Sequence, residues 1–453
     1  MKKILIILLA VVLISGCTQQ QDNSGSISQN DGTILNCEEG FILTDDLLCC
    51  PDADVDGMCD TPPENQPENS PRPRDHNLGL WPPSNCQDID VTFTYSPIPI
   101  EEITRIGPAG VLTVPIAGHI IPNDHNAIGY SGEEVDVIMP ADGFLVMVER
   151  HRYAPPPGEP QVNHYHLYFE HSCSLFTALL HISELDSALL DVSEELRNLD
   201  TKELERDSEN IWPRIPLTAG QKIGTSSQWQ FLGSLSADIR VDKHHSNPES
   251  YSGASWRLHA TTIFEYYEGT LKEQLYDKIL RTAEPRAGKA NYDIDGKLVG
   301  GWFLEGTNGM AGPDPYSEPR QCGNIPCSYW AGHLAFVYDY MEPDWIRVQF
   351  GYELGSSLLG PYGIKGNTPD PADVSPETGL VKYELVNLKD VTIERGVQDY
   401  IVGSPIFTEN ENEVVATVLL EMIDDMTVKL EVFVGKTTSQ VSEFTDNVNI
   451  YVR

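Results

Sequence analysis

The chain has 453 residues, with 30 Lys or Arg against 68 Asp or Glu, and a formal net charge of −38. Such an excess of carboxylates argues against nucleic acid and anionic membrane surfaces as partners, because phosphate groups would repel it. The length favours two or three domains.

The N-terminus has the pattern of a lipoprotein signal peptide over residues 1–16. Two lysines precede an apolar run from Ile4 to Ile14, which is too short to span a bilayer. Small residues come directly before Cys17 and a polar stretch follows it, as in a lipobox. We therefore expect a lipid on Cys17 to anchor the chain to the membrane, outside the cytoplasm; the alternative is a plain secretory signal. No other apolar stretch of the sequence is long enough to cross a membrane.

Three short segments are expected to follow the signal peptide. Residues 17–36 are polar and predict a flexible tether, residues 37–60 form a Cys-rich module, and the prolines of residues 61–83 predict an extended linker. Export places cysteines in an oxidising compartment, where they pair. Apart from Cys17, eight remain: Cys37, Cys49, Cys50, Cys59, Cys86, Cys173, Cys322 and Cys327. The last two flank a short turn and are expected to pair, which leaves Cys86 for Cys173; the pairing among the first four stays open.

The Cys-rich module contains a candidate calcium loop. It places carboxylates at positions 1, 3, 5 and 9 of an EF-hand-like loop, with glycine at position 6, and these carboxylates are Asp52, Asp54, Asp56 and Asp60. Pro63 stands at position 12, where an EF-hand has a glutamate, so the loop more closely resembles the short calcium repeats of thrombospondin-type modules. The alternative is an acidic turn held by disulfides.

Residues 84–289 predict a mainly β domain, because apolar and polar side chains alternate in short runs between turn residues. Two hairpins are expected, from residues 134–139 with 144–149 and from residues 162–171 with 175–182.

Leucines at helical spacing predict a helical insertion over residues 184–207, with Ser183 as its N-cap, and a further helix over residues 271–283. Strand patterns separated by Gly- and Pro-rich turns then return in residues 290–453. This second β-rich domain has the signature of an antiparallel sandwich or barrel.

Ten of the twelve histidines lie between His119 and His259. Imidazole is the commonest protein metal ligand and a frequent acid–base group, so this region is the first candidate for a functional site. His164 and His166 are two residues apart in an expected strand. They therefore share one face and could bind a metal together.

The order of motifs in this region resembles that of the lysostaphin-type zinc metallopeptidases, which cut peptide cross-links in cell walls. Asp136-Val-Ile-Met-Pro-Ala-Asp-Gly143 comes first, followed by Ala178-Leu-Leu-His181 and then by Ala219-Gly-Gln-Lys-Ile-Gly224. The resemblance implies a lysostaphin-like antiparallel β-sheet or β-barrel domain and a zinc ion with three protein ligands and one open position. Position by position, it implies Asp136 as a zinc ligand and His181 as the catalytic, substrate-side histidine.

Two standard ligand positions depart from the family pattern. Gly132 stands where the family has a histidine, and Asp238 stands where it has the second histidine of a His-x-His strand. A zinc site here would need Asp238 and a loop histidine, His125 or His119, beside Asp136. Such a carboxylate-rich set suits zinc less well than a histidine-rich one.

Three functions follow from these patterns. The first, which we favour, is a lipid-anchored surface protein whose degenerate metallopeptidase-like domain no longer catalyses and binds an envelope polymer or a protein partner. The second is an active zinc metallopeptidase or hydrolase with a non-standard ligand set of His125, Asp136, Asp238 and His181. The third is a purely structural envelope lipoprotein.

Overall fold

The computed structural model describes residues 41–43, 49–51, 88–113, 119–153, 162–204, 208–227, 231–312, 321–322, 325–326, 329–351, 358, 360–395 and 405–453. The chain divides into two compact units, residues 1–71 and 72–453. In the first unit, β1 (Phe41–Leu43) pairs antiparallel with β2 (Cys49–Pro51). The signal peptide, the lipidation site Cys17 and the calcium loop with Asp52, Asp54, Asp56 and Asp60 lie outside the described residues, so they stay predictions.

The cysteine pairing also stays a prediction. Cys173 is disulfide-bonded, but its expected partner Cys86 lies outside the described residues. Three further candidates, Cys37, Cys59 and Cys327, lie outside them as well.

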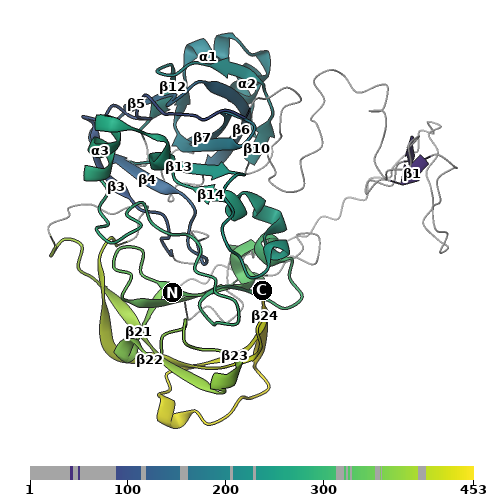
Figure 1. Cartoon of the computed structure of the whole chain (residues 1–453), viewed down its shortest axis with the longest axis vertical. Helices are drawn as coiled ribbons and strands as arrows, with labels where there is room; N and C mark the ends of the chain where they lie inside the picture. The colour runs from purple at the N-terminus through teal and green to yellow at the C-terminus, as the bar shows by residue number, and fades with distance from the viewer. Residues whose placement is uncertain are drawn as a thin grey trace, which may run out of the picture. The chain divides into compact units, whose positions relative to one another are not determined.

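The second unit contains a nine-stranded antiparallel sheet (Figure 1), in which the strand order is β10-β6-β7-β8-β13-β4-β3, with β11 beside β6 and β14 beside β13. Its strands are β3 (Ile103–Gly107), β4 (Asn126–Tyr130), β6 (Gly143–Tyr153), β7 (Val162–Glu170), β8 (Leu175–Ile182), β10 (Ser208–Ile211), β11 (Ile215–Leu217), β13 (Phe231–Asp238) and β14 (Ala260–Thr261). The hairpin expected from residues 162–171 and 175–182 is confirmed as β7 and β8.

The two faces of this sheet have different roles. On β7, Tyr165, Leu167 and Phe169 are at most 3% exposed and belong to the largest apolar cluster. Burying a side chain of this size contributes about 1.5–3 kcal/mol to folding. Because successive strand residues point to opposite faces, His164 and His166 point away from this core.

A smaller sheet covers the same core, in the order β5 (Val135–Ile138), β12 (Lys222–Ser226), β9 (Glu184–Leu185). The hairpin expected from residues 134–139 and 144–149 is therefore wrong, since β5 pairs with β12 and not with β6. Val135 and Val137 bury their side chains in the core from the small sheet, so the turn after β5 leads from one sheet to the other.

Two short helices form within the predicted insertion, α1 (Ser187–Asp191) and α2 (Glu194–Thr201). Their N-caps are Asp186 and Ser193, and Ser183 caps neither because β9 intervenes. The later helix, α3, is shorter than predicted and spans Gly269–Asp277. Short 3₁₀ helices are η2 (Pro248–His259), η3 (Ile263–Tyr266), η4 (Gly309–Ala311), η5 (Tyr329–Gly332), η7 (Lys365–Asn367), η8 (Pro376–Thr378) and η9 (Thr438–Gln440).

The C-terminal region resolves the choice between sandwich and barrel, because eight antiparallel strands close into a barrel. In order around the barrel they are β15 (Gly300–Leu304), β18 (His333–Tyr338), β19 (Ile346–Phe350), β20 (Tyr362–Ile364), β21 (Val381–Asp390), β22 (Thr408–Asp424), β23 (Thr427–Val434) and β24 (Asn449–Val452). Pairing of Phe303 with Val452 closes the ring. A separate strand pair, β16 (Gln321–Cys322) with β17 (Ile325–Pro326), lies outside the barrel. Trp302 and Tyr383 are fully buried in the apolar cluster of the barrel.

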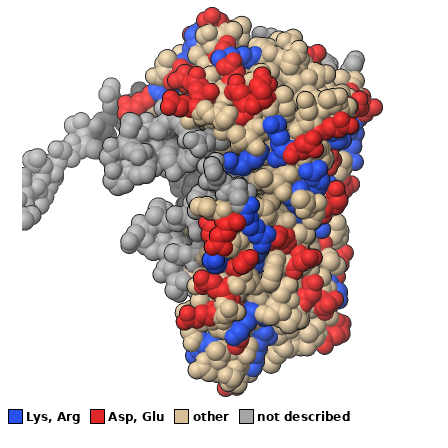
Figure 2. Space-filling model, turned by 90° about the vertical axis from the view of Figure 1, so that its left-hand side faces the viewer, with Lys and Arg blue, Asp and Glu red and all other residues tan. Residues whose placement is uncertain are grey.

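The mainly β fold class is thus confirmed. None of the helices in the described residues is both long and apolar enough to span a membrane. Figure 2 shows acidic side chains spread over the face that it draws, with Lys and Arg among them. The charge excess in the sequence is therefore displayed at the surface, where water solvates it.

Candidate metal centre

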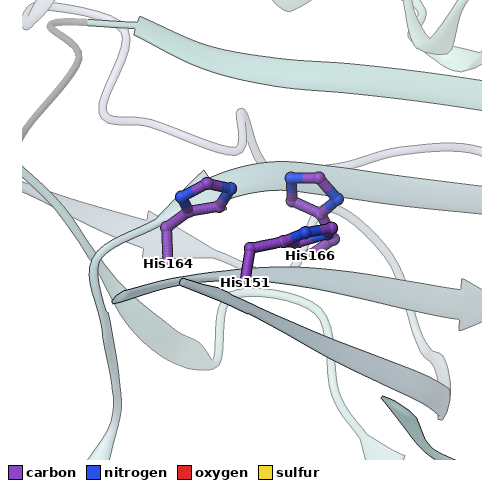
Figure 3. Close-up of side chains that lie close together, drawn as sticks. All are labelled: His151, His164 and His166. Atoms are coloured by element: carbon purple, nitrogen blue, oxygen red, sulfur yellow. The ribbon is translucent and has the colours of Figure 1, made fainter. Parts of the chain in front are cut away.

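Three histidines converge on the face of the large sheet that points away from the core (Figure 3). In the pairing of β6 with β7, His151 stands opposite His164, and Glu149 stands opposite His166. The ring centroid of His151 lies 5.1 Å from that of His164 and 4.3 Å from that of His166. One ligand nitrogen from each of the three rings lies within 4.8 Å of the other two. Strand alternation and register together thus create a three-histidine cluster.

His181 reaches the same cluster through a β-bulge. Tyr165 pairs with Ile182 and Leu167 pairs with Leu179, so two residues of β8 oppose the single residue His166. The backbone of His181 has φ = 69°, a left-handed conformation that is uncommon for a residue with a Cβ. Its ring centroid lies 5.2 Å from His164 and 5.3 Å from His166. The bulge therefore adds a fourth imidazole to the edge of the cluster.

Glu149 connects two of the imidazoles. Its Oε2 lies 3.1 Å from Nε2 of His151 and 3.6 Å from Nδ1 of His166, and the Tyr168 hydroxyl donates to the same oxygen over 3.4 Å. Burial opposes ionisation of Glu149, but its interactions with the two histidines outweigh burial and hold its pKa well below the usual range. The carboxylate can therefore orient these rings in the way that outer-sphere carboxylates orient metal-ligating histidines.

The imidazoles of His164, His166 and His181 are neutral at pH 7. Burial, reinforced by the neighbouring His166 and His151, lowers the pKa of His164 to about 3. Burial is also the main cause that lowers the pKa of His166 and of His181. Neutral imidazole has the free lone pair that a metal ligand needs.

The donor set fits a transition metal. Nε2 of His166 is buried, and no residue that the structure describes forms a hydrogen bond with it. Zinc bound tetrahedrally at 2.0–2.1 Å would bring its ligand nitrogens to about 3.4 Å from one another. The nitrogen–nitrogen separations among His151, His164 and His166 would need to shorten by no more than about 1.5 Å to reach that value.

His125, a predicted zinc ligand, reaches the same face from the residue before β4. Its Nδ1 lies 3.4 Å from Oδ1 of Asp124, and its ring contacts that of His119, with centroids 5.1 Å apart. His125 also contributes to lowering the pKa of His166 and His181, which places it within electrostatic range of both rings. The structure therefore brings His181 to the three-histidine cluster and His125 to within electrostatic range of it, but not the predicted carboxylates.

Asp136 lies on the opposite side of the core. It stands between Val135 and Val137 on β5, whose side chains enter the core, so its own side chain points outward and is 52% exposed. Its Oδ1 forms an ion pair of 2.5 Å with Nζ of Lys222 on β12. The hydrophobic core separates it from the histidines.

Asp238 lies at the wrong end of its strand to reach His181. It pairs with Leu175 at the start of β8, whereas His181 lies six residues further along, about 20 Å away at the usual rise per residue. Its buried carboxylate accepts hydrogen bonds from Arg240 over 2.9 Å and from the Tyr266 hydroxyl over 3.0 Å. Burial opposes ionisation, but these bonds lower the pKa of Asp238.

Sequence reasoning identified the shared face of His164 and His166 but missed His151 and Glu149. A signal was present, because Glu149-x-His151 and His164-x-His166 are two short motifs of period 2 on either side of a proline-rich stretch of sequence. Ending the first strand at Glu149 hid the pairing, since β6 continues to Tyr153.

Comparisons with known proteins add little to this geometry. A scan against family models finds no match, and a search of curated proteins finds none either. Among solved structures, the chain is similar to a zinc-containing peptidase from Vibrio cholerae, with 15% identity over 33% of this chain and a TM-score of 0.19. The match covers 38% of the length of that peptidase chain. A likeness of this size carries no argument about function, and the resemblance to lysostaphin-type enzymes stays a prediction.

Proposed function

We propose that this chain is an extracytoplasmic, lipid-anchored protein that binds a zinc-class metal ion through His151, His164 and His166. The observation that supports the proposal is the convergence of three imidazole side chains on a partly buried sheet face, with one ligand nitrogen of each within 4.8 Å of the other two. Imidazole-rich sets suit zinc, copper and nickel, whereas calcium and magnesium prefer oxygen ligands. Glu149 would act as the outer-sphere acceptor that fixes two of the rings.

Metal content and affinity test the proposal directly. We expect the purified full chain to bind one zinc ion per molecule, measured by mass spectrometry of the metal and by competition with a chromogenic chelator. His164→Gln should weaken zinc binding by a factor of 100 or more in order of magnitude, because it removes one of three ligands. The matched control is His244→Gln, because His244 lies on an exposed loop outside the cluster. Binding that survives His164→Gln, or that is absent from the wild-type chain, would contradict the proposal.

Metal-dependent hydrolysis is a second candidate function. Three protein ligands leave a coordination position open for water or substrate, which is the arrangement of catalytic zinc sites. His181 lies beside two of the three ligands and could contact a bound substrate. Zinc-loaded and chelator-treated chain should be compared on peptidoglycan and on glycine-rich peptides. Cleavage that requires zinc and is lost in His164→Gln would establish an enzyme, whereas zinc binding without cleavage would favour a non-catalytic binder of an envelope polymer or protein.

The lipid anchor is the part of this proposal that rests on sequence alone. Mass spectrometry of the N-terminal peptide should find Cys17 acylated at the mature N-terminus. A mature chain that begins elsewhere, with Cys17 absent or unmodified, would replace the anchor by plain secretion.

A further inference from the structure

A second candidate group lies on the same face of the sheet as the metal centre, next to β4, and it is built around His125. Asp124, its neighbour in sequence, is held firmly: Nε1 of Trp256 donates to its Oδ2 over 2.7 Å, and Nη1 of Arg257 lies 3.2 Å from the same oxygen. Burial opposes ionisation of Asp124, but Arg257, His125 and Trp256 outweigh burial and lower its pKa. The aspartate is therefore a fixed, charged acceptor.

The segment that carries this pair is anchored on both sides. Arg257 donates to the carbonyl of Pro122. Ile120 packs in an apolar cluster with Trp330 and Ile121 in another with Phe303, both from the C-terminal region. Groups held in this way keep one geometry when a ligand arrives, which lowers the entropic cost of binding.

His125 lies on the same sheet face as the metal ligands. Ala127, two residues further along, packs with Phe231 of β13 in an apolar cluster outside the main core. His125 directly precedes β4, two residues before Ala127, and it contributes to lowering the pKa of His166 and of His181. Phe231 in turn contacts His181, with ring centroids 5.1 Å apart. The outer face therefore runs from the metal ligands on β6 and β7, past His181 on β8 and Phe231 on β13, to His125 beside β4.

The hydrogen bond with Asp124 decides what His125 can offer a ligand. An ionised carboxylate only accepts, so Nδ1 of His125 must carry the proton that the pair shares. In the neutral imidazole, Nε2 is then an acceptor. With the residues that the structure describes, the side chain of His125 forms a hydrogen bond to Asp124 through Nδ1. Its Nε2 takes no part in that bond.

We propose that His125 is a ligand-contacting residue that accepts an N–H hydrogen bond from a peptide-type ligand whose other end is held at the metal ion. Asp124 is its positioning residue, because it acts only by fixing the tautomer and the ring. The strands from β7 to β4 are three steps apart, about 14 Å, and a peptide extends about 3.5 Å per residue. A ligand of three or four residues would therefore cover the path. This inference rests on the metal binding proposed above.

Two hydroxamates of different length test this inference on the zinc-loaded full chain. Acetohydroxamate can only occupy the metal, whereas N-acetyl-triglycine hydroxamate adds a peptide long enough to approach His125. We expect His125→Phe to weaken the long probe by about 3- to 10-fold in calorimetry, the range of one lost hydrogen bond. The affinities for acetohydroxamate and for zinc should change by less than about 2-fold. His125→Gln, which retains an acceptor oxygen, should restore part of the binding of the long probe.

A second measurement does not depend on the metal. Long-range ¹H–¹⁵N NMR of the metal-free chain should show His125 protonated at Nδ1, and Asp124→Asn should disturb that tautomer. An Nε2-protonated ring, or equal weakening of both hydroxamates, would overturn the inference. Loss of zinc affinity in His125→Phe would overturn it too, because His125 would then be a metal ligand. If neither hydroxamate binds the wild-type chain, the proposed metal function itself fails.

Discussion

Replacing His181 by glycine and by alanine separates the cost of its backbone conformation from the contacts of its ring. Both variants remove the imidazole, and they differ by one Cβ at a residue with φ = 69°. Left-handed backbone costs a residue with a Cβ about 1–2 kcal/mol. The greater freedom of glycine in the unfolded chain costs about 0.5–1 kcal/mol in the opposite direction. We therefore expect His181→Gly to be more stable than His181→Ala by about 0.5–1 kcal/mol.

Urea unfolding followed by tryptophan fluorescence measures this difference. At a slope of about 2–3 kcal/mol per molar urea, it would move the midpoint by roughly 0.2–0.5 M. Ala178→Gly on the same strand is the matched control, because Ala178 is not among the residues with positive φ and glycine should destabilise there. If His181→Ala proved as stable as His181→Gly, the left-handed bulge would not exist in solution. The explanation of how the His181 ring reaches the candidate metal ligands would then fail.

The remaining predictions concern pH, a buried ion pair and the metal. Burial lowers the pKa of His171 to about 4 in the folded chain, whereas an unfolded histidine titrates near 6.5, so the unfolded chain takes up this proton first as pH falls. The contribution of His171 to the free energy of unfolding should be fully present above pH 6.5 and should fall by about 3 kcal/mol by pH 4. Urea titrations at each pH should show an unfolding free energy that depends less on pH in His171→Asn, but not in His244→Asn, whose side chain is exposed. Asp339 and Arg347 form a buried pair of 2.9 Å, so Asp339→Ala should cost about 3–5 kcal/mol in thermal unfolding, and a loss below 1 kcal/mol would refute that reading. Zinc at 100 times its dissociation constant should add about 2.7 kcal/mol of stability, and a shift that persisted in His164→Gln would place the metal elsewhere.

The sequence predicted the strands better than their partners. Short apolar or alternating runs between turn residues located β7, β8 and most strands of the barrel, because such runs fit strands that are buried on one face or on both. Pairing depends on contacts between distant residues, and the turn after β5 looks the same whether it joins two strands of one sheet or leads from one sheet to another. That ambiguity produced the wrong hairpin between β5 and β6.

The same distinction explains what the sequence revealed of the site. The shared face of His164 and His166 follows from local alternation, so it was predictable. The arrival of His151 depends on the register between β6 and β7, and that of His181 depends on a one-residue bulge. The period-2 spacing of Glu149 and His151 indicates that they share a face, but it does not show which residues of β7 they oppose, and the bulge leaves no local signature. The motif resemblance pointed to Asp136, which the small sheet carries to the far side of the core.

The division of β7 between two faces has a consequence for how such a protein can change over time. Residues that hold the core and residues that gather around the candidate metal position alternate along one strand, so substitutions in one set leave the other set in place. A lineage built on this sheet could gain, lose or move a metal site through a few outward-facing replacements while the core keeps the chain folded. A deletion of one residue within β7 would do the reverse, turning imidazoles into the apolar interior and removing architecture and chemistry in a single step.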